Sequence, residues 1–113
     1  MSGGLGGFRP WFLQRVSAVY LLAYLIFFLA QVLVCPIEDY ARWKAWLSAP
    51  VIWMATALFF LALFMHMWVG LRDVILDYVH PFALRVVLLT GLGAFLAALS
   101  LWIFRALVAV VML

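Results

Sequence analysis

The residues best suited to chemistry lie in one stretch of the sequence, HMWVGLRDVILDYVHP, at residues 66–81. His66 falls inside an apolar run, and an imidazole in such surroundings can ligate a haem iron. Ala62 and Gly70 lie one helical turn on either side of it, so a flat group could approach the backbone there. Many histidines in apolar helices only hydrogen-bond to a neighbouring helix. His66 is therefore a candidate haem ligand, with a purely structural histidine as the alternative.

An aspartate–tyrosine pair, Asp77 and Tyr78, follows at the end of the same run. A tyrosine hydroxyl can donate a hydrogen bond to a quinone carbonyl, and a neighbouring carboxylate can orient it or exchange protons with water. Each residue also has a simpler interpretation, as an aromatic side chain at a membrane interface and as a solvated helix end. On a helix, one face carries Ala62, His66, Gly70, Asp73 and Asp77.

The elements that carry these residues are predicted to be membrane-spanning helices. The chain is 72% hydrophobic and only 10% charged, which leaves too little polar surface for a water-soluble domain of 113 residues. Three apolar runs are long enough to cross the roughly 30 Å hydrocarbon layer. We expect one all-α integral membrane domain over 1–113, with spans at about 12–37, 51–79 and 84–113.

The segments outside the spans have distinct expected roles. The loop 38–50 mixes charged residues with tyrosine and tryptophan, so it should lie along the membrane interface. Pro50 suits the start of the second helix, and Pro81 should end that helix near His80. The glycine-rich start, SGGLGG, is expected to be flexible.

Charge and cysteine content exclude some function classes. The net charge of +3 comes from dispersed residues with no basic cluster, so nucleic acid is not an expected partner and the lipid bilayer is. The single cysteine, Cys35, excludes an intrachain disulfide. Three spans place the termini on opposite sides, and the basic residues weakly favour a cytoplasmic N-terminus. The N-terminal side holds Arg9, Arg15, Arg72 and Arg85, and the other side holds Arg42, Lys44 and Arg105.

The number of histidines bears on how a haem could be bound. A low-spin b-type haem commonly takes two histidine ligands, and His66 is the only histidine within a predicted membrane core. His80 lies about 21 Å further along a helix, so it cannot reach the same iron. A second histidine must then come from another chain, in a heteromer or a homodimer.

The pattern H-x3-G-x6-D-Y-x2-P, formed by His66, Gly70, Asp77, Tyr78 and Pro81, resembles the hydrophobic membrane anchor subunit (D-type) of succinate dehydrogenase. In that family the motif stands in the second of three spans, as it does here. The segment QRVSAVYL in the first span is also similar, because its arginine, Arg15, matches one near the start of the family's first helix.

This resemblance implies a heterotetramer in which the chain is not an enzyme by itself. A flavoprotein subunit and an iron–sulfur subunit would be tethered by this chain and by a cytochrome b-type anchor, a second three-helix subunit that packs against it. By resemblance, His66 is one axial ligand of a shared haem b, Arg15 faces a haem propionate and Gly70 packs against the haem. Tyr78 and Asp77 would belong to the ubiquinone site. The roles of Arg72, Asp73 and His80 stay open, and Arg72 and Asp73 could pair with each other or with the iron–sulfur subunit.

The resemblance also implies a location, the bacterial inner (cytoplasmic) membrane with a cytoplasmic N-terminus, ahead of the mitochondrial inner membrane. Three alternatives stay open. The first is the anchor of a fumarate reductase, an enzyme that runs the succinate–fumarate couple in the reverse direction. A small multi-span exporter would need an acidic residue deep in the membrane, but the first span has none and both acids of the second helix sit at its end. A structural membrane peptide would leave the motif unexplained.

Overall fold

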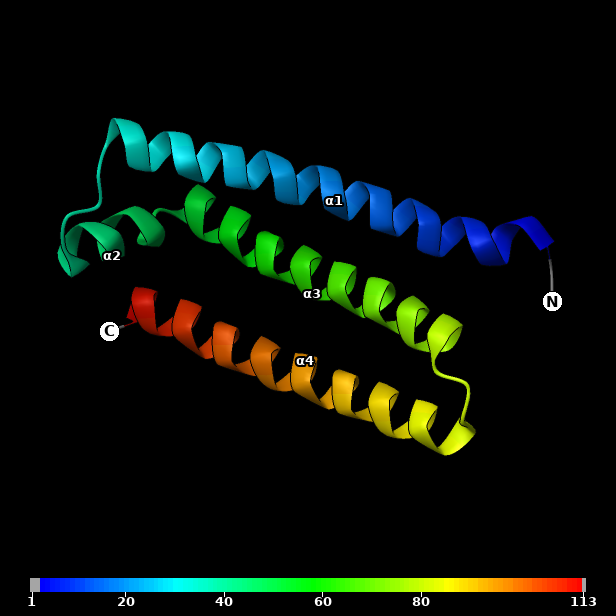
Figure 1. Cartoon of the computed structure of the whole chain (residues 1–113). Helices are drawn as coiled ribbons and strands as arrows, with labels where there is room; N and C mark the ends of the chain where they lie inside the picture. Colours follow the sequence, from blue (N-terminus) through cyan, green and yellow to red (C-terminus); the bar gives the residue numbers. More distant parts are fainter. Residues whose placement is uncertain (1–2, 113) are drawn as a thin grey trace.

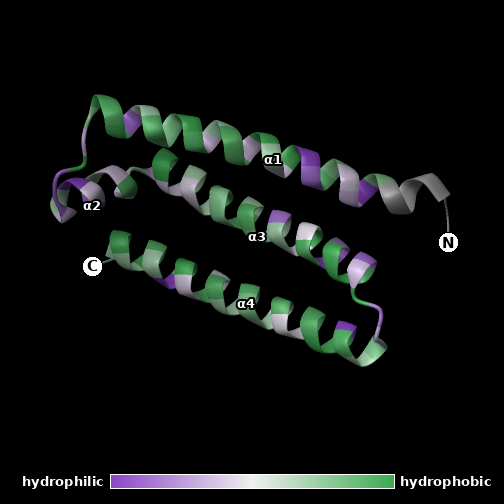
Figure 2. Cartoon of the chain, in the orientation of Figure 1, coloured by the Kyte–Doolittle hydropathy of each residue, from purple (hydrophilic) through white to green (hydrophobic). Residues whose placement is uncertain are grey.

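The computed structural model describes the backbone of residues 3–112 and the side chains of residues 8–112. Within that part the chain folds into four helices, α1 (Gly3–Val34), α2 (Tyr40–Ser48), α3 (Pro50–Tyr78) and α4 (Phe82–Met112). The three long helices are each apolar and long enough to cross a membrane, which confirms the all-α fold with three transmembrane helices. Apolar residues dominate all three, while polar residues gather at α2, at the connections and in the N-terminal part of α1 (Figure 2).

The three long helices lie side by side with α3 between α1 and α4 (Figure 1), and we call this arrangement the helical layer. α3 packs against both α1 and α4, whereas the backbones of α1 and α4 do not come into contact over residues 3–112. α2 crosses one end of this layer and contacts α3 and α4. The start of α1 and the α3–α4 turn lie together at the opposite end. We call these two regions the α2 end and the Tyr78 end.

Local sequence explains where most helices begin and end. Pro50 occupies the first turn of α3, where its missing N–H costs no hydrogen bond. Val79, two residues before Pro81, is extended and ends the helix (φ −101°, ψ 113°). α2 was not anticipated within the interfacial loop. Its start is capped by Asp39, whose carboxylate accepts a hydrogen bond from the backbone N–H of Arg42 at 2.8 Å.

The glycine-rich start was expected to be flexible; α1 begins at Gly3 within it, and Ser2 lies outside the described residues. Helical hydrogen bonding continues outward from the apolar span through this segment, although each glycine opposes it by about 1 kcal/mol relative to alanine. Pro10 also lies inside α1.

Little of the apolar surface is buried within the chain itself. In the most apolar window of each long helix, only 11% to 17% of the residues are buried. The main cluster of buried side chains, Leu47, Leu107 and Val110, lies at the α2 end. The remaining apolar surface must face lipid or other proteins.

Polar side chains tie neighbouring helices together inside this apolar layer. The Tyr20 hydroxyl donates to the Ala55 carbonyl at 2.6 Å, and the hydroxyls of Tyr24 and Thr56 are 2.7 Å apart, which joins α1 to α3. At the α2 end, Nε1 of Trp53 donates to the Leu107 carbonyl at 2.8 Å, which joins α3 to α4.

Candidate functional site

His66 lies on α3 and faces α1. Its Nδ1 atom is 3.0 Å from the Oγ atom of Ser17, a residue of α1 that is only 4% exposed. The ring itself is half-buried. His66 thus makes the cross-helix hydrogen bond of a structural histidine, but it does so with one ring nitrogen only. Nε2 makes no hydrogen bond to any described side chain or backbone group, and it is not enclosed.

The hydrogen bonds of Ser17 fix the direction of this contact. Ser17 Oγ donates its proton to the backbone carbonyl of Gln14 at 3.0 Å, within the same helix. A serine hydroxyl carries one proton, so toward His66 it acts as an acceptor. This arrangement matches a neutral ring that carries its proton on Nδ1. In the neutral ring, Nε2 then carries the free lone pair.

Gly70, one turn further along α3, lies against Gln14. A Cβ atom at Gly70 would be only 3.1 Å from Nε2 of Gln14, closer than ordinary van der Waals contact. The glycine therefore gives room to the Gln14 amide between α1 and α3. Oε1 of Gln14 is buried and has no hydrogen-bond partner among the described residues. A buried acceptor without a donor is energetically costly.

A cleft of about 410 Å³ opens beside this layer, between the N-terminal part of α1 and the last turns of α3. Arg15 and Arg72 are both in its wall, with Asp73. The guanidinium of Arg15 lies 5.4 Å from the centroid of the Trp11 ring. Arg72 and Asp73, whose roles the sequence left open, pair with each other at 3.1 Å. Two guanidiniums against one carboxylate leave this cleft with a positive balance that suits an anionic group.

Asp77 and Tyr78 form the last residues of α3, and both are exposed; Tyr78 is 77% exposed. Neither side chain hydrogen-bonds to another residue within the range 8–112. Arg85 stabilises the turn that follows, since its guanidinium donates to the backbone carbonyls of Val79 and Leu76. The pair is thus presented at the Tyr78 end on a braced turn, open to another molecule.

The structure brings His66 and Gly70 against α1, whereas the Asp77–Tyr78 pair stands apart at the surface. Ser17, Gln14 and Arg85 were not among the candidate site residues predicted from the sequence. The spacing of Gln14 and Ser17 places both on one face of α1, and these were polar residues in or beside an apolar span. That signal marks a polar helix face without saying which residue of another helix it meets.

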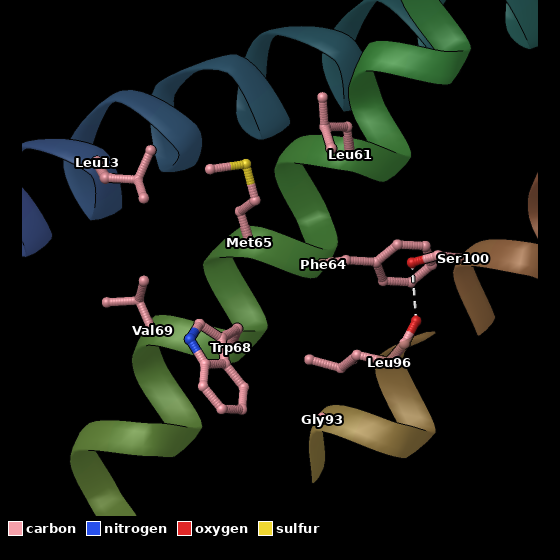
Figure 3. A pocket seen from close by; sticks show the side chains of 9 residues that line it. All are labelled: Leu13, Leu61, Phe64, Met65, Trp68, Val69, Gly93, Leu96 and Ser100. Atoms are coloured by element: carbon pink, nitrogen blue, oxygen red, sulfur yellow. Dashed lines mark hydrogen bonds between the residues drawn. The ribbon is translucent and has the colours of Figure 1, made fainter. Parts of the chain in front are cut away.

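An apolar groove of about 370 Å³ runs between the long helices near the middle of α3 (Figure 3). It is lined mainly by aliphatic and aromatic side chains such as Leu13, Met65 and Trp68. The Ser100 hydroxyl also lines the groove, and it donates a hydrogen bond to the Leu96 carbonyl at 2.8 Å. With no titratable side chain in its wall, this groove offers a hydrophobic surface and no reactive group.

Comparison with known proteins identifies the relatives of this chain. A family model described as succinate dehydrogenase/fumarate reductase transmembrane subunit matches residues 8–110. The chain belongs to this family. It is also 28% identical, over 96 residues, to the succinate dehydrogenase hydrophobic membrane anchor subunit of Coxiella burnetii, covering 85% of this chain and 84% of that protein. The resemblance drawn from the sequence is confirmed, and the chain is a multi-pass membrane anchor of this family.

The residues of this anchor are compatible with a b-type haem. His66 has a free and accessible ring nitrogen, and the cleft with Arg15 and Arg72 suits carboxylates. No group of three or more His, Cys, Asp or Glu side chains gathers within residues 3–112. The chain's other histidine, His80, is exposed beyond the end of α3 and does not lie beside His66.

Proposed function

We propose that this chain is the membrane anchor subunit of a respiratory succinate dehydrogenase, and that it performs no succinate chemistry itself. It would tether the flavoprotein and iron–sulfur subunits to the bilayer beside a cytochrome b-type anchor subunit. Most of the apolar surface of its single helical layer is free for lipid and for that second anchor. The family match over residues 8–110 supports this role.

Within that complex, we assign His66 as one axial ligand of a haem b shared with the second anchor. This assignment rests on the two nitrogens of the His66 ring. Nδ1 is hydrogen-bonded to Ser17, and Nε2 is free. Arg15 would bind a haem propionate from the adjoining cleft, and Gly70 would set the close α1–α3 spacing beside the haem. When bound, haem supplies a one-electron carrier.

Tyr78 and Asp77 are assigned to the ubiquinone site. Tyr78 would donate a hydrogen bond to a quinone carbonyl, and Asp77 would exchange protons with water. Their exposure at the end of α3 supports this role, because both side chains are available to a molecule held between subunits. The start of α1 lies at the same end of the layer (Figure 1). We place this end on the cytoplasmic side of a bacterial inner membrane.

The haem assignment is tested by the reduced-minus-oxidised visible spectrum of the purified complex. His66→Ala should abolish the b-type α-band, while His80→Ala, which alters an exposed histidine beyond the end of α3, should leave it intact. Co-purification of the two soluble subunits with each variant separates loss of haem from loss of assembly. A full α-band in His66→Ala would remove His66 from the iron.

The alternative within the family is the anchor of a fumarate reductase, which would use the same membrane residues. The ratio of succinate oxidation to fumarate reduction by the purified complex distinguishes the two. An exporter is disfavoured, since Asp73 and Asp77 are both exposed near the end of α3 rather than embedded in the layer.

A further inference from the structure

We propose that Ser17 is a positioning residue for His66, which holds the ring in the tautomer that can bind haem iron. This inference rests on the proposed function, because it assumes that His66 is the iron ligand. It concerns a residue of α1 that neither the motif in α3 nor the family resemblance singles out.

The reason lies in the two forms of a neutral imidazole. Only a ring nitrogen without a proton can bind iron, and the hydrogen bond made by the other nitrogen decides which one that is. A hydroxyl that donated to Nδ1 of His66 would leave the proton on Nε2 and block ligation. A hydroxyl that accepts from Nδ1 leaves Nε2 free. Ser17 therefore helps haem binding only if its own proton is engaged elsewhere.

The structure meets this condition through a relay of three groups. Nδ1 of His66 lies 3.0 Å from Ser17 Oγ, and this oxygen can accept its proton because Ser17 donates its own to the Gln14 carbonyl at 3.0 Å. Ser17 is 4% exposed, so water does not compete for either bond. The carbonyl of Gln14 can only accept, which gives the whole relay one direction.

The other cross-helix hydroxyls of α1 are used differently. Tyr20 donates to a backbone carbonyl, and Tyr24 pairs with the Thr56 hydroxyl. Neither partner is a side chain that could bind haem iron. Among these contacts, Ser17 alone meets a side chain with a second nitrogen left free. Partners in the outer shell of a metal ligand typically change metal affinity or activity by 10–100-fold when they are removed.

The test compares side chains of matched shape at position 17. Ser17→Val and Ser17→Thr have nearly the same volume and differ in the hydroxyl, and Ser17→Ala removes the hydroxyl without adding bulk. Haem content, the midpoint potential and the EPR g-values of the oxidised haem are measured on the complete complex. We expect Ser17→Ala and Ser17→Val to weaken haem retention about 10–100-fold. They should also raise the midpoint potential, because a ligand that loses its acceptor donates less charge to the iron. Ser17→Thr should restore both.

Thr56→Ala is the control, since Thr56 is a hydroxyl residue of similar burial that joins α1 to α3 away from His66. It should leave potential and g-values unchanged. Wild-type retention, potential and g-values in both Ser17→Ala and Ser17→Val would overturn the inference, as would equal changes in Thr56→Ala. If His66→Ala keeps its α-band, the proposed function fails instead, so the two failures are distinguishable.

Discussion

The two ends of the helical layer are built on different principles. The α2 end closes on itself, because Leu47, Leu107 and Val110 form a buried cluster and Trp53 links α3 to α4 through a backbone carbonyl. The Tyr78 end is open, with an exposed Asp77–Tyr78 pair. The stability that the chain supplies for itself is thus concentrated at one end, and the groups available to other molecules are at the other.

Between the two ends, the α1–α3 contact changes in character. Tyr20, Tyr24 and Thr56 satisfy one another or the backbone completely. Closer to the Tyr78 end, His66 keeps a free nitrogen and Gln14 keeps an unpartnered oxygen. Polar atoms without a hydrogen-bond partner in apolar surroundings destabilise an isolated chain. We therefore expect this half of the molecule to depend on its partners far more than the α2 end does.

The largest effect should come from breaking the closed end. Leu107→Ala should destabilise the assembled complex by about 2 kcal/mol, because it leaves a cavity in the one compact cluster. Detergent or thermal unfolding followed by haem absorbance measures this change, and the native spectrum should be unaltered. Leu101→Ala, at a position that is 72% exposed on the same helix, is the matched control. Equal stability of the two variants would show that the α2 end is not self-supporting.

The next effect concerns the open end. Tyr78→Phe should lower succinate-dependent quinone reduction about tenfold, which corresponds to about 1.4 kcal/mol, because it removes a hydrogen bond to the quinone. Haem absorbance and subunit composition should not change. Tyr40→Phe removes a similarly exposed hydroxyl at the α2 end and should be silent. Wild-type turnover in Tyr78→Phe would make Tyr78 an interfacial aromatic residue only.

The smallest effect should come from two glycines. Gly91 has open space around its missing Cβ, so Gly91→Ala should stabilise α4 by up to about 1 kcal/mol through helix propensity. Gly70→Ala should not increase stability in this way, because the new Cβ must displace the Gln14 amide. It should also shift the haem α-band. Unfolding curves and visible spectra of the two variants provide the comparison. If Gly70→Ala matched Gly91→Ala in both, the α1–α3 spacing at Gln14 would not matter.

The sequence by itself determined the membrane class, the three spans and the candidate residues of α3. These follow from the length of the apolar runs relative to the bilayer and from the rarity of polar groups within them. Pro50 and Pro81 also marked the bounds of α3, because proline acts on the backbone locally. The family motif added the expected roles of His66, Gly70 and Tyr78.

Only the tertiary structure decided which groups meet. A helix that is apolar nearly all round has no face that predicts its neighbour, so the sequence could not pair Ser17 with His66 or Gln14 with Gly70. The pairing of Arg72 with Asp73 likewise depends on side-chain rotamers rather than on spacing. The hydrogen bond of His66 is a contact between two helices, and such contacts depend on helix rotation and register, which hydrophobic length leaves undetermined.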